Sequence, residues 1–246
     1  MTRTFSMALA ATAIALTPAC AQSEVGAADK AAIEKVVYDY IMANPEIVEE
    51  ALIKLGEQRD AEEAEQARLA IADNLDALAN NPADYSVGPA DAAITVVEFF
   101  DYRCGFCKRS ADWATALPDQ YDNQVRVVFK ELPILSTESE KAALAAIAAG
   151  KQGKYIEMHM GLMELDNGSG FGPDQIDAVA EAAGIDVNKM RADMQSIEVQ
   201  KTVSDAKGLA RDLAISGTPY FIVGTEAVSG ADTQRVEALI EAALES

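Results

Sequence analysis

The stretch Ile94-Thr-Val-Val-Glu-Phe-Phe-Asp-Tyr-Arg-Cys-Gly-Phe-Cys107 decides the fold that this sequence predicts. Its first seven residues are β-branched or aromatic with one exception, which is typical of a strand buried on both faces. A Cys-x-x-Cys pair follows that strand, and residues 108–117 then show a helical pattern. This order places Cys104 at a helix N-terminus, where unpaired N–H groups and the helix dipole favour the thiolate.

The two cysteines of this pair are expected to differ. Cys107 falls one turn inside the helix and is the more buried, which suits a resolving thiol, whereas a low pKa makes Cys104 a nucleophile and a good leaving group. A structural zinc site is one alternative, but zinc needs four ligands. The chain has no second such pair and a single histidine, so no metal site is expected. A pair of inert free thiols is the other alternative.

Further apolar runs complete an α/β pattern. Buried strands are predicted over residues 125–130 and 220–223, and a short fourth strand over 225–229 precedes a final helix that Asp232 can cap. The residues between the second and third strands are helical in pattern. The predicted order is strand, cysteine pair, helix, strand, several helices, two strands and a helix.

Two other features point to the cysteine pair. Thr218-Pro219 opens the third strand, a position where the missing N–H of proline is tolerated. An ordinary trans bond is the alternative there, since only about 5–6% of X–Pro bonds are cis. Glu98 and Lys130 lie in buried strands, where charges are costly unless they are paired. If they meet beneath Cys107, they can relay its proton; a plain structural ion pair, or a solvated strand end for Lys130, is the alternative.

Four segments together resemble the DsbA family of thioredoxin-fold thiol–disulfide oxidoreductases. They are Phe99–Lys108, Phe129–Ile134, Tyr155–His159 and Gly217–Phe221. The resemblance covers residues 85–246 and implies an α/β thioredoxin fold with a helical insertion at about 136–215.

The resemblance also implies roles for the site residues. Cys104 is then the nucleophile and Cys107 the resolving thiol of a redox-active disulfide, and no bound cofactor is expected. Pro219 is cis and faces the pair, and Thr218 docks the substrate backbone. His159 falls in a helix of the insertion, and we expect it to pack or lie at the surface rather than catalyse.

Two departures from the family pattern affect the direction of the reaction. DsbA oxidases commonly carry Pro-His between the cysteines, whereas this chain carries Gly105-Phe106, similar to the Dsb isomerases, which predicts a weaker oxidant. A helical segment before the catalytic domain is similar to that of ScsC-like members. We favour net oxidation, with isomerisation or reduction left open. The rival interpretation is a non-catalytic exported chaperone or a Cu(I)-binding thiol protein.

Composition and the first residues indicate the compartment. The 246 residues carry a net charge of −20, which disfavours nucleic acid and anionic membrane surfaces as partners. Residues 1–21 resemble a signal peptide cleaved after Ala21, with lipidation at Cys20 as the alternative. A periplasmic protein is therefore expected. Its expected partners are reduced or unfolded exported proteins and a membrane redox partner of the DsbB or DsbD type.

Residues 22–84 are expected to form a helical extension, separated from the catalytic domain by the turn-rich residues 80–89. Helices are predicted on both sides of Asn44-Pro45, followed by an acidic stretch from Gln58. Their apolar stripe comprises Ile33, Val36, Val37, Tyr40, Ile41, Val48, Leu52 and Leu55. Such a stripe needs a covering surface. We favour self-association through residues 30–80 over packing on the same chain.

Overall fold

The computed structural model describes residues 27–168 and 170–245. The predicted signal peptide, and Cys20 with it, lies outside the described residues. The chain divides into two compact units, the first ending at Glu57 and the second beginning at Gln58, and each is described by itself.

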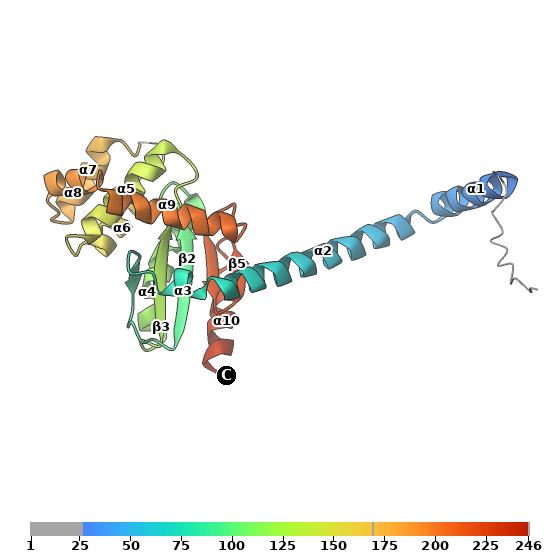
Figure 1. Cartoon of the computed structure of the whole chain (residues 1–246), viewed down its shortest axis with the longest axis horizontal. Coiled ribbons are helices and arrows are strands. Elements are labelled where there is room, and N and C mark those ends of the chain that lie inside the picture. The colour runs from blue at the N-terminus through green and yellow to red at the C-terminus, as the bar shows by residue number, and fades with distance from the viewer. Residues whose placement is uncertain (1–26, 169, 246) are drawn as a thin grey trace, which may run out of the picture. The chain divides into compact units, whose positions relative to one another are not determined.

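The second unit is built on a five-stranded mixed sheet (Figure 1). Its strands are β1 (Tyr85–Val87), β2 (Ile94–Phe100), β3 (Val125–Glu131), β4 (Tyr220–Val223) and β5 (Glu226–Ser229). The order across the sheet is β1-β3-β2-β4-β5, with β2 and β3 parallel and the other neighbours antiparallel. The prediction missed β1, since three residues are too few to show an alternating pattern against the turn residues around them.

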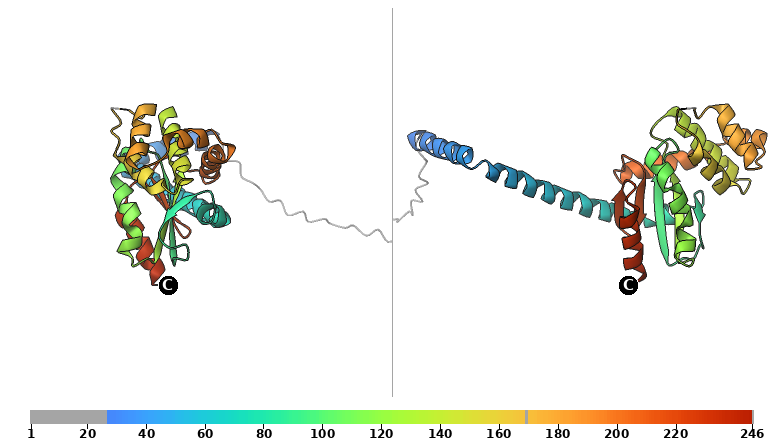
Figure 2. Two further views of the ribbon diagram at one scale, coloured as in Figure 1. Left: turned by 90° about the vertical axis from the view of Figure 1, so that its left-hand side faces the viewer. Right: turned by 180° about the vertical axis from the view of Figure 1, so that it is seen from behind.

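Helices cover both faces of this sheet. The helices are α1 (Ala27–Ala43), α2 (Glu46–Asp73), α3 (Leu75–Ala79), α4 (Gly105–Gln120), α5 (Thr137–Gly150), α6 (Tyr155–Glu164), α7 (Pro173–Ala182), α8 (Val187–Asp193), α9 (Ile197–Asp212) and α10 (Thr233–Leu244). We call the face covered by α4 and α10 the front face, and the face covered by α3, α9 and the end of α2 the back face. Figure 2 shows α10 running along the sheet. Helices α5 to α9 form the insertion between β3 and β4, which confirms the expected α/β thioredoxin fold.

The alternation along β2 explains the two cores. Phe100 points into the cluster on the front face and Phe99 into the cluster on the back face, and both are fully buried. Fully burying one such side chain is worth about 1.5–3 kcal/mol. The central strand therefore fixes both helical layers, as its apolar run predicted.

The boundary of the N-terminal extension differs from the prediction. We expected a separate segment over residues 22–84, but residues 58–84 belong to the second unit. Ile71 and Leu78 are 1% exposed and lie in the back-face cluster. The stretch from Gln58 has few large apolar residues and so reads as solvated, yet these two are enough to hold its end on the sheet.

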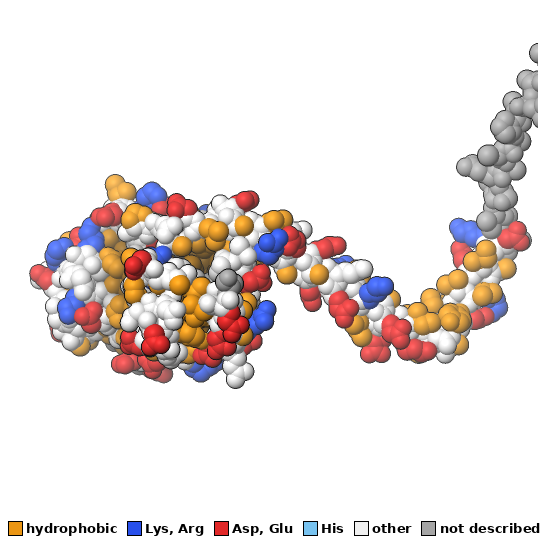
Figure 3. Space-filling view, turned by 90° about the horizontal axis from the view of Figure 1, so that it is seen from below, with side chains coloured by type: hydrophobic (Ala, Val, Ile, Leu, Met, Phe, Trp, Pro, Cys, Tyr) orange, Lys and Arg blue, Asp and Glu red, His pale blue; other side chains and the backbone are white. Residues whose placement is uncertain are grey.

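The first unit consists of α1 and the beginning of α2, which break at Asn44-Pro45 as predicted. Its apolar side chains are solvent-exposed: Val36 is 68% and Leu52 is 64% exposed. Figure 3 shows hydrophobic side chains gathered on these N-terminal helices. None of the helices within the described ranges has the length and apolar character that a membrane span requires.

Candidate active site at the paired cysteines

Cys104 lies where β2 has ended and α4 begins. It is the N-cap residue of α4, and its Sγ accepts a hydrogen bond from the Cys107 N–H at 3.4 Å. A sulfur in this position stands at the positive end of the helix dipole. The sequence-based placement of Cys104 at a helix N-terminus is therefore confirmed.

Several hydrogen bonds act on the Cys104 sulfur. The Cys107 side chain, the Thr218 side chain and the N–H groups of Cys107 and Phe106 together lower the pKa of Cys104 to about 5, against the opposing effect of burial. The carbonyl oxygen of Thr218 lies 3.1 Å from Sγ and accepts from the thiol form. That last contact favours the protonated state, and the donors to the thiolate outweigh it.

Cys107 is in the opposite situation. It is fully buried in the front-face core, and burial is the main cause that raises its pKa, followed by its hydrogen bond to Cys104. Both cysteines are free thiols in the structure. The pair thus combines an acidic thiol at the protein surface layer with a buried thiol that loses its proton reluctantly, as the sequence predicted.

The Thr218–Pro219 peptide bond is cis, as expected. Thr218 lies beside Cys104 through the contact of its carbonyl oxygen with Sγ. Residues 114 positions apart in the sequence therefore meet at one site. Proline has no N–H to donate, so the backbone next to the sulfur keeps only acceptors free for a neighbouring chain.

Glu98 lies on the front face of β2 and is 1% exposed. Burial, and the charge of Cys104, raise the pKa of Glu98 to about 8. Its Oε1 has no hydrogen-bond partner among the described residues. A carboxyl group held protonated near neutral pH beside two thiols is chemically suited to exchange protons with them.

The predicted pairing of Glu98 with Lys130 is wrong. The register places Glu98 opposite Phe129, so that Lys130 points to the back face. There its ammonium donates to the Ala77 carbonyl at 2.6 Å and forms an ion pair with the buried Asp84 carboxylate. Lys130 consequently fixes residues 77–84 to the sheet and takes no part in the cysteine site.

Asp101 is a site residue that the sequence analysis missed. Its buried carboxylate accepts hydrogen bonds from the N–H groups of Arg103 (2.7 Å), Ile134 (2.9 Å) and Leu135 (3.0 Å). It thereby joins the loop that carries Cys104 to the loop that follows β3. The bond to Arg103 is an Asx turn, which an Asp two residues earlier permits, but the other loop is not visible from the sequence.

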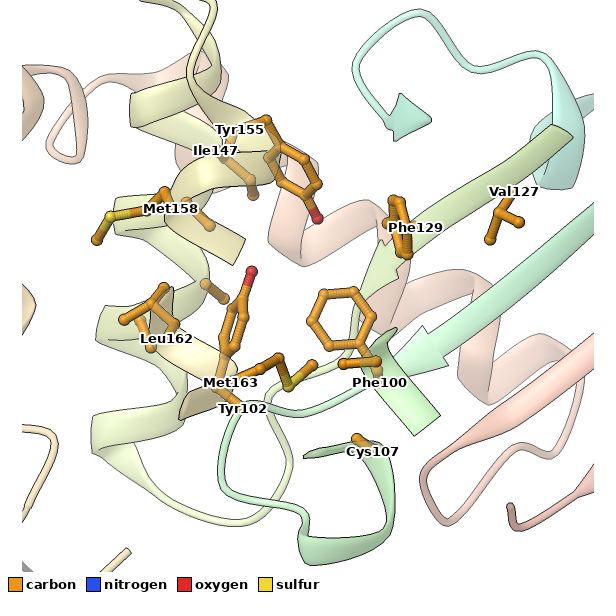
Figure 4. Close-up of a cluster of buried hydrophobic side chains, with 14 of the residues drawn as sticks. Phe100, Tyr102, Cys107, Val127, Phe129, Ile147, Tyr155, Met158, Leu162 and Met163 are labelled. Atoms are coloured by element: carbon orange, nitrogen blue, oxygen red, sulfur yellow. The ribbon is translucent and has the colours of Figure 1, made fainter. Parts of the chain in front are cut away.

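A second buried polar group lies above Cys107. The Tyr102 and Tyr155 hydroxyls both donate to Glu131 Oε1 at 2.9 Å, and they point toward one another in Figure 4. The Tyr102 oxygen also lies 3.1 Å from His159 Nδ1. Desolvation lowers the pKa of His159 to about 3. Because the fully buried His159 ring packs against Phe100, it is a packing residue, as expected.

Phe106, between the cysteines, faces outward. It is 57% exposed, and the guanidinium of Arg109 lies 4.3 Å from the centroid of its ring. Among residues 27–168 and 170–245, no group of three or more His, Cys, Asp or Glu side chains converges to hold a metal ion.

Comparisons with known proteins place this site in a family. The description "DSBA-like thioredoxin domain" matches residues 95–241, more than half of the chain and the whole of the cysteine site. The chain belongs to the DsbA-like thioredoxin family. The description "Copper resistance protein ScsC N-terminal domain" matches residues 29–63, which include α1 and the first part of α2.

Solved structures and curated relatives agree with this family membership. A thioredoxin-like oxidoreductase from Silicibacter pomeroyi DSS-3 is 34% identical, with a TM-score of 0.65, and the match covers 70% of this chain and 98% of that one. Proteus mirabilis ScsC in a transitional conformation is 30% identical, with a TM-score of 0.63, over 89% of this chain and 99% of that one. A probable disulfide bond formation protein D from Bacillus cereus is 27% identical over 152 residues, 56% of this chain and 68% of that protein. The chain spans 21% of the length of the first curated relatives it matches, which are Na⁺/H⁺ antiporters from Salinispora.

Proposed function

We propose that this protein is an exported thiol–disulfide oxidoreductase that exchanges disulfides through Cys104 and Cys107. The observation that carries the proposal is the position of the Cys104 sulfur, at the N-cap of α4 and beside Thr218, with a pKa lowered to about 5. At pH 7 such a group is almost entirely thiolate, whereas an ordinary cysteine with a pKa of ~8.5 is only about 3% ionised. The family supports the same assignment.

The reaction in the oxidising direction has two steps. A substrate thiolate attacks Cys104 of the oxidised pair, the Cys104–Cys107 bond breaks, and Cys107 leaves as a thiolate that takes up a proton. A second substrate thiolate then attacks the substrate sulfur of the mixed disulfide, the substrate disulfide forms, and Cys104 leaves as a thiolate. Its low pKa makes it the better leaving group, which favours release of an oxidised substrate.

Glu98 is proposed as the group that exchanges the proton with Cys107. It is buried on the same face of the sheet, it has a raised pKa near 8, and one of its oxygens has no partner within the described residues. Its charge contributes to the raised pKa of Cys107. A neutral Glu98 can therefore give its proton to the departing Cys107 thiolate, and an ionised one can receive it in the reverse direction.

The loop at Thr218 and Pro219 is proposed as the docking site for the substrate backbone. Its carbonyl reaches the Cys104 sulfur, so an extended chain that pairs with this loop brings its own sulfur to the same point. Reduced or unfolded exported polypeptides, and a membrane redox partner of the DsbB or DsbD type, are the proposed partners, and the periplasm is the proposed compartment.

We propose net oxidation as the direction. A thiolate that is stabilised in the reduced state makes the disulfide state the less stable one, which raises the reduction potential. The Gly105-Phe106 dipeptide adds no cation between the cysteines, so the potential is expected between about −200 and −120 mV rather than at the strongly oxidising end.

Equilibration with glutathione tests both the function and the direction. The oxidised protein, mixed with a reduced two-cysteine peptide, is expected to form the disulfide of the peptide stoichiometrically, and Cys104→Ser is expected to form none. A potential below about −250 mV would contradict the oxidising direction. The absence of any exchange by the wild-type protein would contradict the function itself.

Self-association through the first unit is a further part of this proposal. The exposed apolar side chains of α1 and the beginning of α2 exceed what an isolated surface tolerates. Like charges on a chain of net charge −20 oppose assembly, but their repulsion is screened beyond about 8 Å at 0.15 M ionic strength. A second copy of the same apolar surface is therefore the proposed covering.

Deleting residues 22–57 from the mature protein is expected to convert an oligomer into a monomer, measured as solution mass by light scattering at 0.15 M salt. The deletion stops at Glu57 because Ile71 and Leu78 belong to the core of the second unit. Val36→Asp with Tyr40→Asp in the full chain is expected to have the same effect, since charges at exposed positions disrupt an apolar contact without removing a helix. A mature chain that is already monomeric at high concentration would exclude this proposal.

A further inference from the structure

Lys108 has surroundings that the proposed reaction has not used so far. It follows Cys107 directly in α4 and is half-buried. Its ammonium donates to three backbone carbonyl oxygens at the end of α6, those of Leu162 (3.4 Å), Met163 (2.9 Å) and Leu165 (2.6 Å). The fully buried ring of Phe171 lies 4.9 Å from the same nitrogen.

These contacts make a built cage for one positive charge. The last carbonyl groups of a helix have no partner within the helix, and a cation there also meets the negative end of the dipole. A lysine that only filled space would turn its ammonium to water, which costs less than ordering it among carbonyls. Lys108 instead ties the helix that carries the cysteines to the inserted helices.

The cage also places this charge in the field of Cys107. Desolvation lowers the pKa of Lys108, while the negative charges of Asp166, Asp101 and an ionised Cys107 raise it, so the lysine and the thiolate stabilise each other. Successive helix side chains diverge, so this is a through-space effect rather than a hydrogen bond.

The other groups around Cys107 make its thiolate harder to form. Burial, the Cys104 thiolate and the Glu98 carboxylate all raise its pKa. In either direction of exchange, Cys107 nevertheless passes through the thiolate, as the leaving group when the pair is opened and as the attacking group when it closes. A nearby cation is therefore useful whichever direction prevails.

We propose that Lys108 is a positioning residue for the exchange reaction, because its caged ammonium holds the end of α6 against α4 and supplies the positive charge that stabilises Cys107 as a thiolate. This inference rests on the proposed function. It assigns Lys108 to Cys107, in contrast to the N-cap hydrogen bonds that serve Cys104.

Glutathione disulfide separates the two cysteines in one experiment. Reduced protein reacts in a first step in which the Cys104 thiolate forms a mixed disulfide and releases one glutathione. In the second step the Cys107 thiolate attacks the Cys104 sulfur, the Cys104–Cys107 disulfide forms, and the second glutathione leaves. Acid quenching and mass spectrometry give both rates in the full mature protein.

Lys108→Gln and Lys108→Met are expected to leave the first rate within about twofold and to slow the second. Loss of a nearby cation raises a thiol pKa by about one unit. The lower thiolate fraction, partly offset by the greater nucleophilicity of a more basic thiolate, gives a second step about three- to tenfold slower at pH 7. Lys108→Arg, which keeps the charge, is expected to restore most of the rate. In a Cys104→Ser background, thiolate absorbance is expected to show the pKa of Cys107 higher in the Gln variant than with Lys108.

Arg109→Gln is the matched control, since it removes one positive charge from the next residue, whose guanidinium lies over Phe106 instead. It is expected to leave the second rate unchanged. The inference is overturned if Arg109→Gln slows that step equally, if Lys108→Arg is as slow as Lys108→Met, or if both steps slow by one factor. A wild-type protein that forms no mixed disulfide would refute the proposed function itself, a result visible before any variant is made.

Discussion

Cys107→Ser is expected to arrest the protein as a covalent complex with a disulfide substrate. Cys104 still attacks, because serine can donate the hydrogen bond that Cys107 gives to its sulfur, but no thiol remains to release the complex. An intramolecular attack typically has an effective concentration of 10⁵ M or more, so release is expected to slow by at least about 10³-fold. Non-reducing electrophoresis after incubation with insulin measures the trapped complex, and Cys104→Ser is expected to trap nothing.

The pH dependence of trapping follows from the pKa of Cys104. A pKa of about 5 predicts a rate that is constant above about pH 6 and falls about tenfold per pH unit below 5. Cys107→Ala is the control, because it removes the donor as well as the thiol and should move this midpoint to higher pH. Equal midpoints for the Ser and Ala variants would contradict the role of that hydrogen bond.

The depressed pKa also links the redox state to stability. In the reduced protein the folded pKa of Cys104 is below its unfolded value of ~8.5, so the stabilisation is complete above about pH 8.5. It is lost progressively as the pH falls to 5. The trapped complex, in which Cys104 is no longer ionisable, lacks this contribution.

Lys130→Met is expected to destabilise the fold by about 3–5 kcal/mol while leaving the pKa of Cys104 unchanged. The substitution leaves the Asp84 carboxylate buried without its cation and the Ala77 carbonyl without its donor. Burial raises the pKa of Asp84 even in the presence of Lys130. We expect the loss to be larger at pH 8 than at pH 5, where the unpaired carboxyl takes up a proton more easily.

Urea denaturation at both pH values measures this loss. The double variant Asp84→Asn with Lys130→Met removes the stranded charge and is expected to recover part of the stability. A loss below about 1 kcal/mol at pH 8 would show that the pair is not buried in solution. A shifted pKa of Cys104 in Lys130→Met would instead revive a connection between Lys130 and the cysteine site.

The parts of the fold that could be predicted are those determined by local pattern. The strands β2, β3 and β4 are buried on both faces, and their β-branched and aromatic runs are unmistakable, so the predicted bounds lie within about two residues. The position of Cys104 at a helix start followed from the adjacent strand alone. The edge strand β1 and the packing of Ile71 depend on partners elsewhere in the chain, which no local pattern contains.

The candidate site divides in the same manner. Glu98 and Lys130 both stood out as buried charges, yet whether they meet depends on the register of β2 against β3, and a shift of one residue reverses the face. Asp101 binds a loop more than thirty residues away, and Lys108 binds the end of α6 more than fifty residues away. Such contacts belong to tertiary structure, and neither residue carries a distinguishing signal in the sequence.

The separation of Glu98 and Lys130 onto opposite faces has a consequence for how such proteins diversify. The attachment of residues 58–84 uses the back face, through Lys130, while the thiols and Glu98 use the front face. An N-terminal segment can therefore be exchanged, lengthened or redesigned through back-face substitutions without retuning the redox pair. For protein engineering, grafting a different N-terminal module requires matching only Asp84 and the apolar residues above the sheet, and selection can act on the module and the chemistry independently.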